Sequence, residues 1–315
     1  MVSIHRLASL GIAAWLCAPG MAPAQPRTVV MVPVPAPASA VEYRIQSVAD
    51  LDRAFAFYRD VIGLPVLEAS ADAAAWFPGG LAGTAGARVR AARFDLPGAD
   101  AGLLLAEFGG VDRRPQRPRP TDPGAATLIV SVRDLDAVVA AAGDFGAPIA
   151  VRGGGVADFA VLVDPDGFFV EVARPAPLPA EAGAGNVVGV RVAFTVAESE
   201  PVAAFYRDVL GFSLEGDAAV GERVTRVARI PGGPLAWEFR AFPDADRMVH
   251  AGRLQDPGTP AMAVRVPNVQ VAAEAARRAG LPILSVGGEP VMQEAEGLVM
   301  IRDPGGLLLE LIERR

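Results

Sequence analysis

The sequence predicts an α+β protein built from four βαβββ modules that pair into two domains, and three observations support this. The nine residues AFYRDVIGL at 56–64 recur almost unchanged as AFYRDVLGF at 204–212. The segment DPDGFFVEV at 164–172 is matched by DPGGLLLEL at 303–311. Amphipathic helical patterns alternate with strand-like runs along 41–315. A repeat of this length predicts a tandem duplication of a whole domain.

Four helices are expected where apolar side chains recur on one helical face behind a residue that can cap the helix. The expected N-caps are Asp50, Asp134, Ser199 and Asn268. Gly63 is expected to end the first helix, because glycine readily adopts the left-handed conformation that closes a helix.

Each expected helix follows a strand-like run, and further strand-like runs come after it. The repeating unit is therefore one strand, one helix and about three more strands. The Asp-Pro-x-Gly sequences at 164–167 and 303–306 are expected to form tight turns between strands, because Pro fixes φ and Gly allows the left-handed position.

The first 24 residues are expected to be a signal peptide. A short basic end precedes the apolar run LASLGIAAWLCA, and APA at 22–24 offers small residues for cleavage before Gln25. An uncleaved membrane anchor is the alternative, although this run is short for a membrane span. Cleavage predicts a periplasmic or extracellular protein with no transmembrane span. It would also remove Cys17, the single cysteine, which leaves no disulfide and no thiolate metal site.

Two Pro- and Ala-rich segments divide the remainder of the chain. Residues 25–40 are expected to form an extended tether, and 175–187 an interdomain linker. The first domain is then 41–174 and the second 188–315. The formal net charge of −7 disfavours nucleic acid as a partner.

These motifs resemble the vicinal oxygen chelate superfamily, also called the glyoxalase/bleomycin-resistance/dioxygenase family. The resemblance rests on V-x-D-L before AFYRDVIGL, on the weaker V-A-E-S before AFYRDVLGF, and on the two Asp-Pro-x-Gly-x-x-x-Glu endings. It covers almost all of 41–315. It implies mixed sheets that curl around a pocket, with the helices outside. In the family's enzymes the pocket holds a divalent metal, bound from the first and last strand of each module.

The resemblance assigns eight positions of this chain to the pocket. The first-strand ligand, usually His, corresponds to Tyr43, Thr127, Arg191 and Ala261. The last-strand ligand, usually Glu, corresponds to Leu104, Glu171, Glu238 and Glu310. A slip of the alignment would put Glu107 in place of Leu104. Three carboxylates remain, and none of the first-strand residues is a usual ligand for a divalent metal.

This residue set disfavours the family's metal enzymes. An extradiol dioxygenase needs two His and one carboxylate, whereas His250 is the only histidine left after cleavage. A glyoxalase-type lyase needs a hexacoordinate nickel or zinc site, for which each domain offers too few Glu. No cofactor is therefore expected, and a weak Ca²⁺ or Mg²⁺ site completed by water stays open.

Arg191 is expected to replace the metal as the cationic centre of the second domain. Glu238 and Glu310 keep the carboxylates of a metal site, and one guanidinium can hydrogen-bond to both. The alternatives are a solvent-exposed Arg191 and purely structural carboxylates. Arg44 is the competing cation in the first domain, but strand alternation turns it away from the face of Tyr43.

The sequence thus favours an exported, metal-independent protein that binds an unidentified small molecule, similar to the family's bleomycin-binding members. One alternative is a divergent lyase, isomerase or epimerase with a reorganised site. Another is a structural or partner-binding module whose pockets are filled by side chains. An apolar pocket with a few polar groups would favour the first interpretation, and bound metal the second. An exposed apolar patch over a filled pocket would favour the third.

Overall fold

The structure is a computed structural model that describes residues 36–69, 81, 83–153, 158–175, 184–220, 223–231, 233–243 and 246–314. The described residues belong to one compact unit, 33–315. The expected signal peptide and most of the tether lie outside the described residues. Within the described ranges, no helix has the length and apolar character needed to cross a membrane.

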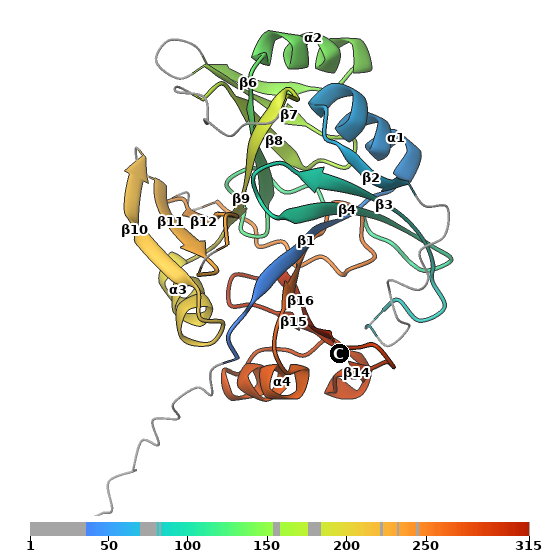
Figure 1. Ribbon diagram of the computed structural model, residues 1–315, viewed down its shortest axis with the longest axis vertical. Coiled ribbons are helices and arrows are strands. Elements are labelled where there is room, and N and C mark those ends of the chain that lie inside the picture. The colour runs from blue at the N-terminus through green and yellow to red at the C-terminus, as the bar shows by residue number, and fades with distance from the viewer. Residues whose placement is uncertain are drawn as a thin grey trace, which may run out of the picture. The chain divides into compact units, whose positions relative to one another are not determined.

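Four βαβββ modules follow one another along the chain, with the helices at the periphery (Figure 1). Module 1 (40–109) comprises β1 (Ala40–Ser47), α1 (Leu51–Ala56) with its π-helical continuation η1 (Phe57–Ile62), β2 (Val66–Ala69), β3 (Arg88–Leu96) and β4 (Ala101–Gly109). Module 2 (126–173) comprises β5 (Ala126–Val132), α2 (Leu135–Phe145), β6 (Ile149–Gly153), β7 (Phe159–Val163) and β8 (Phe169–Ala173).

The second half of the chain repeats this order. Module 3 (187–241) comprises β9 (Val187–Thr195), α3 (Ser199–Asp208), β10 (Ser213–Val220), β11 (Arg223–Arg229) and β12 (Trp237–Ala241). Module 4 (260–314) comprises β13 (Pro260–Arg265), α4 (Val269–Arg278), the 3₁₀ turn η3 (Val286–Gly288), β14 (Val291–Met292), β15 (Glu296–Arg302) and β16 (Leu308–Arg314). The predicted α+β class with four βαβββ modules is confirmed.

Three of the four expected helix caps form. The side chains of Asp50, Asp134 and Asn268 each accept a hydrogen bond from the backbone N–H three residues later, at 3.0, 2.9 and 2.9 Å. The expectation for Ser199 is wrong, because α3 already begins at this residue and Glu198 before it makes no side-chain capping bond. Gly63 ends the first helix in the left-handed conformation, as expected.

The two sheets of the described chain are mixed, and each contains eight strands. The first sheet has the order β14-β15-β16-β13-β1-β4-β3-β2, so it joins modules 1 and 4. The second sheet has the order β10-β11-β12-β9-β5-β8-β7-β6, so it joins modules 2 and 3. The antiparallel pairs β1–β13 and β5–β9 form the two seams. Each sheet therefore draws on both halves of the sequence.

A different set of contacts links modules that are neighbours in sequence. The Tyr58 hydroxyl on η1 donates to Asp164 in the turn before β8, at 2.9 Å. The Tyr206 hydroxyl on α3 donates to Asp303 in the turn before β16, at 3.0 Å. Both turns are the predicted Asp-Pro-x-Gly turns, and their last glycines have φ near +92°. Sheet pairing thus joins module 1 to module 4 and module 2 to module 3. The hydroxyl–carboxylate bonds instead join module 1 to module 2 and module 3 to module 4.

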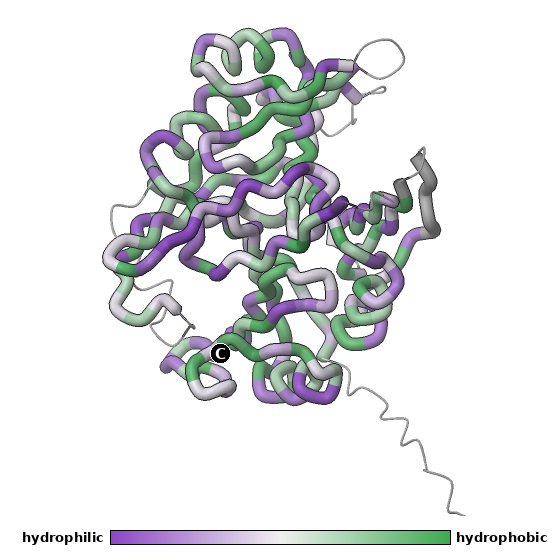
Figure 2. Tube along the Cα trace, turned by 180° about the vertical axis from the view of Figure 1, so that it is seen from behind, coloured by the Kyte–Doolittle hydropathy of each residue, from purple (hydrophilic) through white to green (hydrophobic). Residues whose placement is uncertain are grey.

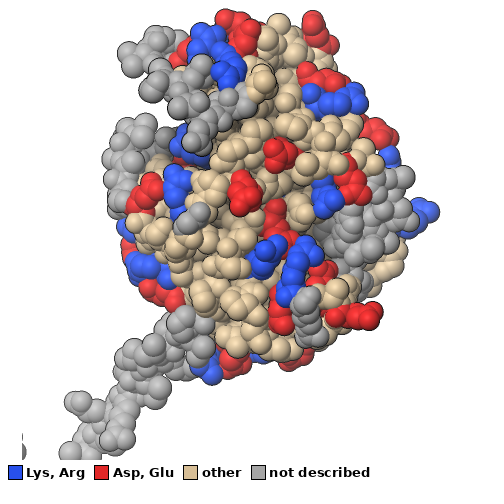
Figure 3. Space-filling model, viewed as in Figure 1, with Lys and Arg blue, Asp and Glu red and all other residues tan. Residues whose placement is uncertain are grey.

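Strand alternation gives each sheet two faces. On β4, Leu103 and Leu105 pack into the core that contains the helices, while Leu104 and Ala106 belong to a separate apolar cluster on the opposite face. We call the face that carries Leu104, and its equivalent in the second sheet, the site face. Apolar strands run through the interior, while polar residues recur along the helices and loops (Figure 2). Acidic and basic side chains are interspersed on the face shown in Figure 3, without a large field of one sign.

The connector between modules 1 and 2 (110–125) and the connector between modules 3 and 4 (242–259, described except for 244 and 245) cross each other through equivalent contacts. The backbone N–H of Gln116 donates to the carbonyl of Pro257 at 2.7 Å, and that of His250 donates to Pro123 at 2.8 Å. Gly124 (φ +98°) and Gly258 (φ +86°) lie at these crossings. A Cβ at either glycine would come within 2.2 or 2.3 Å of a carbonyl oxygen of the opposite connector. The repeated Asp-Pro-Gly sequences therefore permit a close approach of two backbones.

Candidate functional site

A cavity of about 190 Å³ opens on the site face of the first sheet. Tyr43 and Leu104 of module 1 line it together with Glu310 of module 4. The register explains this meeting, because Tyr43 lies opposite Ala263 on β13, and Ala263 lies opposite Glu310 on β16. Ala261 is fully buried in the apolar cluster of the same face. The other lining residues are Glu42, Arg93, Glu296, Leu298, Ile312 and Arg314.

Ion pairs fix most of the charged groups around this cavity. Glu42 accepts hydrogen bonds from Arg265 at 2.8 Å and from Arg314 at 2.6 Å. Burial alone would raise the pKa of Glu42, but these two guanidinium groups outweigh it and hold the pKa below its usual range. Arg314 also pairs with Glu296 at 3.3 Å. These carboxylates therefore already have cationic partners.

Arg93 supports the opposite side of the cavity. It donates to the Tyr43 hydroxyl at 2.9 Å and forms an ion pair with Glu68 on the edge strand β2. The phenol of Tyr43 is thereby held in position by a charge-assisted hydrogen bond.

Glu310 differs from its neighbours because its carboxyl group makes no hydrogen bond or ion pair with any described residue. Only 5% of the residue is exposed. Burial, and then the negative charges of Glu296 and Glu42, raise its pKa to about 8, against the opposing charge of Arg314. At neutral pH this carboxyl group is therefore mostly protonated, and it faces the cavity as an uncharged acid.

The equivalent positions of the second sheet hold a chain of alternating charges instead. Arg191 donates to one carboxylate oxygen of Glu238. Arg240 donates to the other oxygen through two nitrogens, at 3.1 and 2.8 Å. A third nitrogen of Arg240 reaches Glu171 at 3.3 Å. Thr127 lies on the neighbouring strand β5, opposite Ala193.

Of the two pairings expected for Arg191, the structure shows one. Its expected pairing with Glu238 forms, although half of the Arg191 side chain (51%) is exposed. The expected pairing with Glu310 is wrong, because Glu310 belongs to the first sheet. The sequence reasoning also missed Arg240, whose side chain is only 9% exposed. Its position two residues after Glu238 on one strand was the available signal, since such residues share a face.

Two further residues lie on the helix side of the first sheet. Glu107 accepts from the backbone N–H of Leu51 at 3.1 Å, at the start of α1, so it does not take the place of Leu104. Arg44 is fully buried away from the face of Tyr43, as alternation predicts. Its guanidinium donates to the Thr127 carbonyl at 3.4 Å and lies 5.7 Å from the centroid of the Phe168 ring.

The residues at the family's ligand positions do not fit a transition-metal site. The first sheet offers one carboxyl group, from Glu310, beside a phenol and two apolar side chains. In the second sheet the guanidinium groups of Arg191 and Arg240 already engage both carboxylates, and they would repel a divalent cation. Within the described residues, no cluster of three or more His, Cys, Asp or Glu is arranged to hold an ion.

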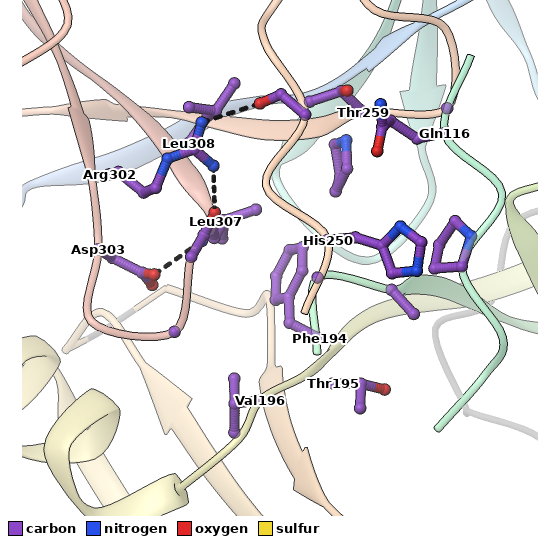
Figure 4. A pocket seen from close by; sticks show the side chains of 18 of the residues that line it. Gln116, Phe194, Thr195, Val196, His250, Thr259, Arg302, Asp303, Leu307 and Leu308 are labelled. Atoms are coloured by element: carbon purple, nitrogen blue, oxygen red, sulfur yellow. Dashed lines mark hydrogen bonds between the residues drawn. The ribbon is translucent and has the colours of Figure 1, made fainter. Parts of the chain in front are cut away.

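A second hollow lies where loops of modules 3 and 4 meet the connectors (Figure 4). Arg302 crosses it and donates to the carbonyls of Gly306 and Gly252 at 2.7 and 2.9 Å. His250 and Thr259 also line it. Its volume of about 20 Å³ has room for roughly one water molecule. The first-sheet cavity is therefore the better candidate for a ligand site.

Solved structures with the same fold include the following two proteins. Glyoxalase I from maize (Zea mays) has a TM-score of 0.63 and 18% identity, over 87% of this chain and 92% of that one. A putative dioxygenase from Bacillus subtilis subsp. subtilis str. 168 has a TM-score of 0.56 and 13% identity, over 89% of this chain and 86% of that one. No curated protein matches the chain.

The comparison with protein families is more specific. The model of the Glyoxalase/Bleomycin resistance protein/Dioxygenase superfamily matches residues 41–172 and 190–311, which together make up most of the sequence. These segments correspond to the two expected domains, and each contains two of the observed modules. The chain therefore belongs to the Glyoxalase/Bleomycin resistance protein/Dioxygenase superfamily.

Proposed function

We propose that this protein binds a small organic molecule in the first-sheet cavity without a metal ion. The observation that carries the proposal is the cavity itself, at the family's pocket position. Its volume of about 190 Å³ accommodates a small ring compound, and Leu104, Leu298 and Ile312 supply apolar surface. Tyr43 and Glu310 add a few polar groups, which is the usual composition of a ligand pocket.

The second sheet does not bind the same ligand in this proposal. Its carboxylates from Glu171 and Glu238 are engaged by Arg240 and Arg191. A ligand would have to displace these ion pairs, at the cost of leaving charge unpaired. Of the two site faces, only that of the first sheet is therefore expected to bind the ligand.

Fragment binding measured by NMR on the isotopically labelled protein tests this proposal. Fragments of different charge are titrated into the wild type and into Leu104→Trp, in which the larger side chain fills the cavity. The matched control is Val161→Trp on β7, opposite Glu171 on the second sheet. Loss of binding in Leu104→Trp alone supports the proposal, whereas equal binding in all three proteins contradicts it.

The metal-independent part of the proposal has its own measurement. Elemental analysis of protein purified without added metal should find no stoichiometric zinc, nickel or iron. About one tightly held transition ion per chain would contradict this part, because the site residues offer such an ion too few free donors.

The exported location is proposed from the N-terminal sequence alone. Basic, apolar and small residues follow one another in the order of a signal peptide, ending at APA. Mass spectrometry of the protein from the cell envelope or the medium should find a chain that begins near Gln25. An intact Met1 on protein from the cytosol would contradict export.

Glu310 favours a second candidate function, that of an isomerase or epimerase. A carboxyl group with a pKa of about 8 inside a cavity suits proton transfer near neutral pH. A panel of uncharged and cationic carbonyl compounds with a C–H next to the carbonyl group can be incubated with the protein in deuterated water. Deuterium incorporation next to the carbonyl group that disappears in Glu310→Gln would favour this function over simple binding.

A further inference from the structure

The site faces of the two sheets can be matched residue by residue through their registers. Ser47 on β1 lies opposite Ala106 on β4, and Thr195 on β9 lies opposite Arg240 on β12. The hydroxyls of Ser47 and Thr195 donate to equivalent connector carbonyls, those of Leu254 and Pro120. Ala106 is therefore the counterpart of Arg240.

The same reasoning matches the two carboxyl groups. Glu310 on β16 lies opposite Ala263 on β13, and Glu171 on β8 lies opposite Ile129 on β5. In the second sheet Arg240 bridges to Glu171. In the first sheet the fully buried methyl group of Ala106 stands in that position and supplies no cation. Glu310 is thus a buried carboxyl group whose guanidinium partner is missing from its own sheet.

The charges around the cavity indicate what could replace that partner. The lining contains three carboxyl groups and two guanidinium groups, and Arg314 and Arg93 already hold other residues. Glu310 is the carboxyl group left over. A ligand with a positive charge would relieve this imbalance, whereas an anion would add to the repulsion from Glu42 and Glu296.

We propose that the cavity binds an organic cation, namely a protonated amine, amidine or guanidine with a small apolar group. Its charged end occupies the place that the Arg240 guanidinium has in the second sheet and pairs with the carboxylate of Glu310. Its apolar part contacts Leu104, Leu298 and Ile312. This inference rests on the proposed function and specifies the chemical class of the ligand.

Three compounds of nearly equal shape test the charge of the ligand: benzamidine is a cation, benzamide is neutral and benzoate is an anion. Affinities are measured by NMR titration at pH 8.5, where benzamidine stays charged and more than half of Glu310 is ionised, given its pKa of about 8. Benzamidine should bind about 10- to 100-fold more tightly than benzamide, the range expected for hydrogen bonds to a charged group. Benzoate should bind least.

Variants assign this preference to Glu310. Glu310→Gln should remove the advantage of benzamidine over benzamide. Glu171→Gln removes the same charge at the counterpart position and should leave benzamidine binding unchanged. Ala106→Arg supplies the missing guanidinium from the chain itself and should abolish benzamidine binding. If Ala106→Arg does not fold, Glu310→Gln and its control still decide the question.

The outcomes separate this inference from the proposed function. Benzamide or benzoate binding in the cavity as tightly as benzamidine would overturn the cation inference and leave small-molecule binding intact. Benzamidine affinity that survives Glu310→Gln would overturn it equally. If no fragment of any charge shifts the resonances of the cavity residues, both proposals fail.

Discussion

The site faces of the two sheets carry carboxyl groups at equivalent positions, from the buried Glu310 and the partly exposed Glu171, but neutralise them differently. In the second sheet, Arg240 and Arg191 satisfy Glu171 and Glu238 within the chain. In the first sheet, Glu310 has no such partner among the residues that the structure describes, and its pKa is raised to about 8. A buried charge must either be paired or become neutral, and the two sheets illustrate both outcomes. The duplicated fold thus keeps its strand register while residues at equivalent positions, such as Arg240 and Ala106, differ in whether they supply a cation.

The largest effect is expected from removing the cation that closes the second sheet. Arg240→Met keeps the apolar stem of the side chain but leaves Glu238 buried with only Arg191 as a partner. Breaking a buried ion pair in this way should lower the free energy of unfolding by about 3–5 kcal/mol. A urea titration of the wild type and the variant measures this. A loss below about 1 kcal/mol would mean that Arg240 is not needed to neutralise the carboxylates of the second sheet.

Glu310→Gln tests the unpaired carboxyl group of the first sheet through the pH dependence of protein stability. The folded-state pKa of Glu310 is raised from 4.5 to about 8. The folded protein therefore binds the proton of Glu310 more tightly than the unfolded chain does. The resulting contribution to the free energy of unfolding is fully present below about pH 4.5 and is lost as the pH rises to about 8. Glutamine cannot ionise, so the free energy of unfolding of the variant should exceed that of the wild type by about 4–5 kcal/mol at pH 8.5, from about 1.4 kcal/mol per pKa unit.

At pH 4.5 the two proteins should be almost equally stable. Asp164 and Asp303 also have raised pKa values, mainly because of burial, but both proteins contain them and their contributions cancel. Denaturant titrations at the two pH values measure the difference. A constant difference at both values would show that Glu310 does not titrate in this range. Glu171→Gln is the matched control, because Glu171 has a cationic partner.

Substitutions at the two connector crossings should destabilise the protein equally, in contrast to substitutions at the two site faces. Gly124→Ala and Gly258→Ala each force a Cβ into a backbone carbonyl, at a positive φ that alanine tolerates poorly. Each should cost about 2 kcal/mol of unfolding free energy, within the range of strained substitutions. Thermal unfolding of the two variants side by side gives the comparison. Markedly unequal losses would indicate that the two crossings are not energetically equivalent.

The smallest effect is expected at Arg191. Half of its side chain is exposed, so solvent screens its pairing with Glu238. Arg191→Met should therefore lower stability by no more than about 1 kcal/mol, well below the loss in Arg240→Met. A larger loss in the same urea titration would indicate that Arg191, rather than Arg240, is the main cation that stabilises the carboxylates of the second sheet.

Local features of the fold could be predicted from the sequence because they depend on neighbouring residues. The modules, three of the four caps and the Asp-Pro-x-Gly turns follow from periodicity, side-chain capping and backbone preference. About three strands were expected after each helix, but the edge strands β2, β6, β10 and β14 were not assigned to residues. The strands β2 and β6 are short and largely exposed, so they lack an apolar pattern.

The pairing of the modules could not be read in the same way. All four modules are similar, and the sequence of a strand such as β1 does not specify whether it pairs with β5 or with β13. The error at Glu310 follows from this, since the residue was placed in the wrong sheet. The resemblance assigns only ligand positions to the pocket, and Arg240 is not one of them. It lies two residues after Glu238, which is such a position.

The crossed arrangement of modules limits how the chain can be divided. The seams β1–β13 and β5–β9 both run between the two halves of the sequence. Either half alone would expose two unpaired strand edges, which are templates for association with another chain. Two separate copies of a half could cover each other's edges through the same seams. The single chain therefore has the internal layout of a symmetric dimer, and the linker 175–187 makes that association intramolecular, independent of protein concentration.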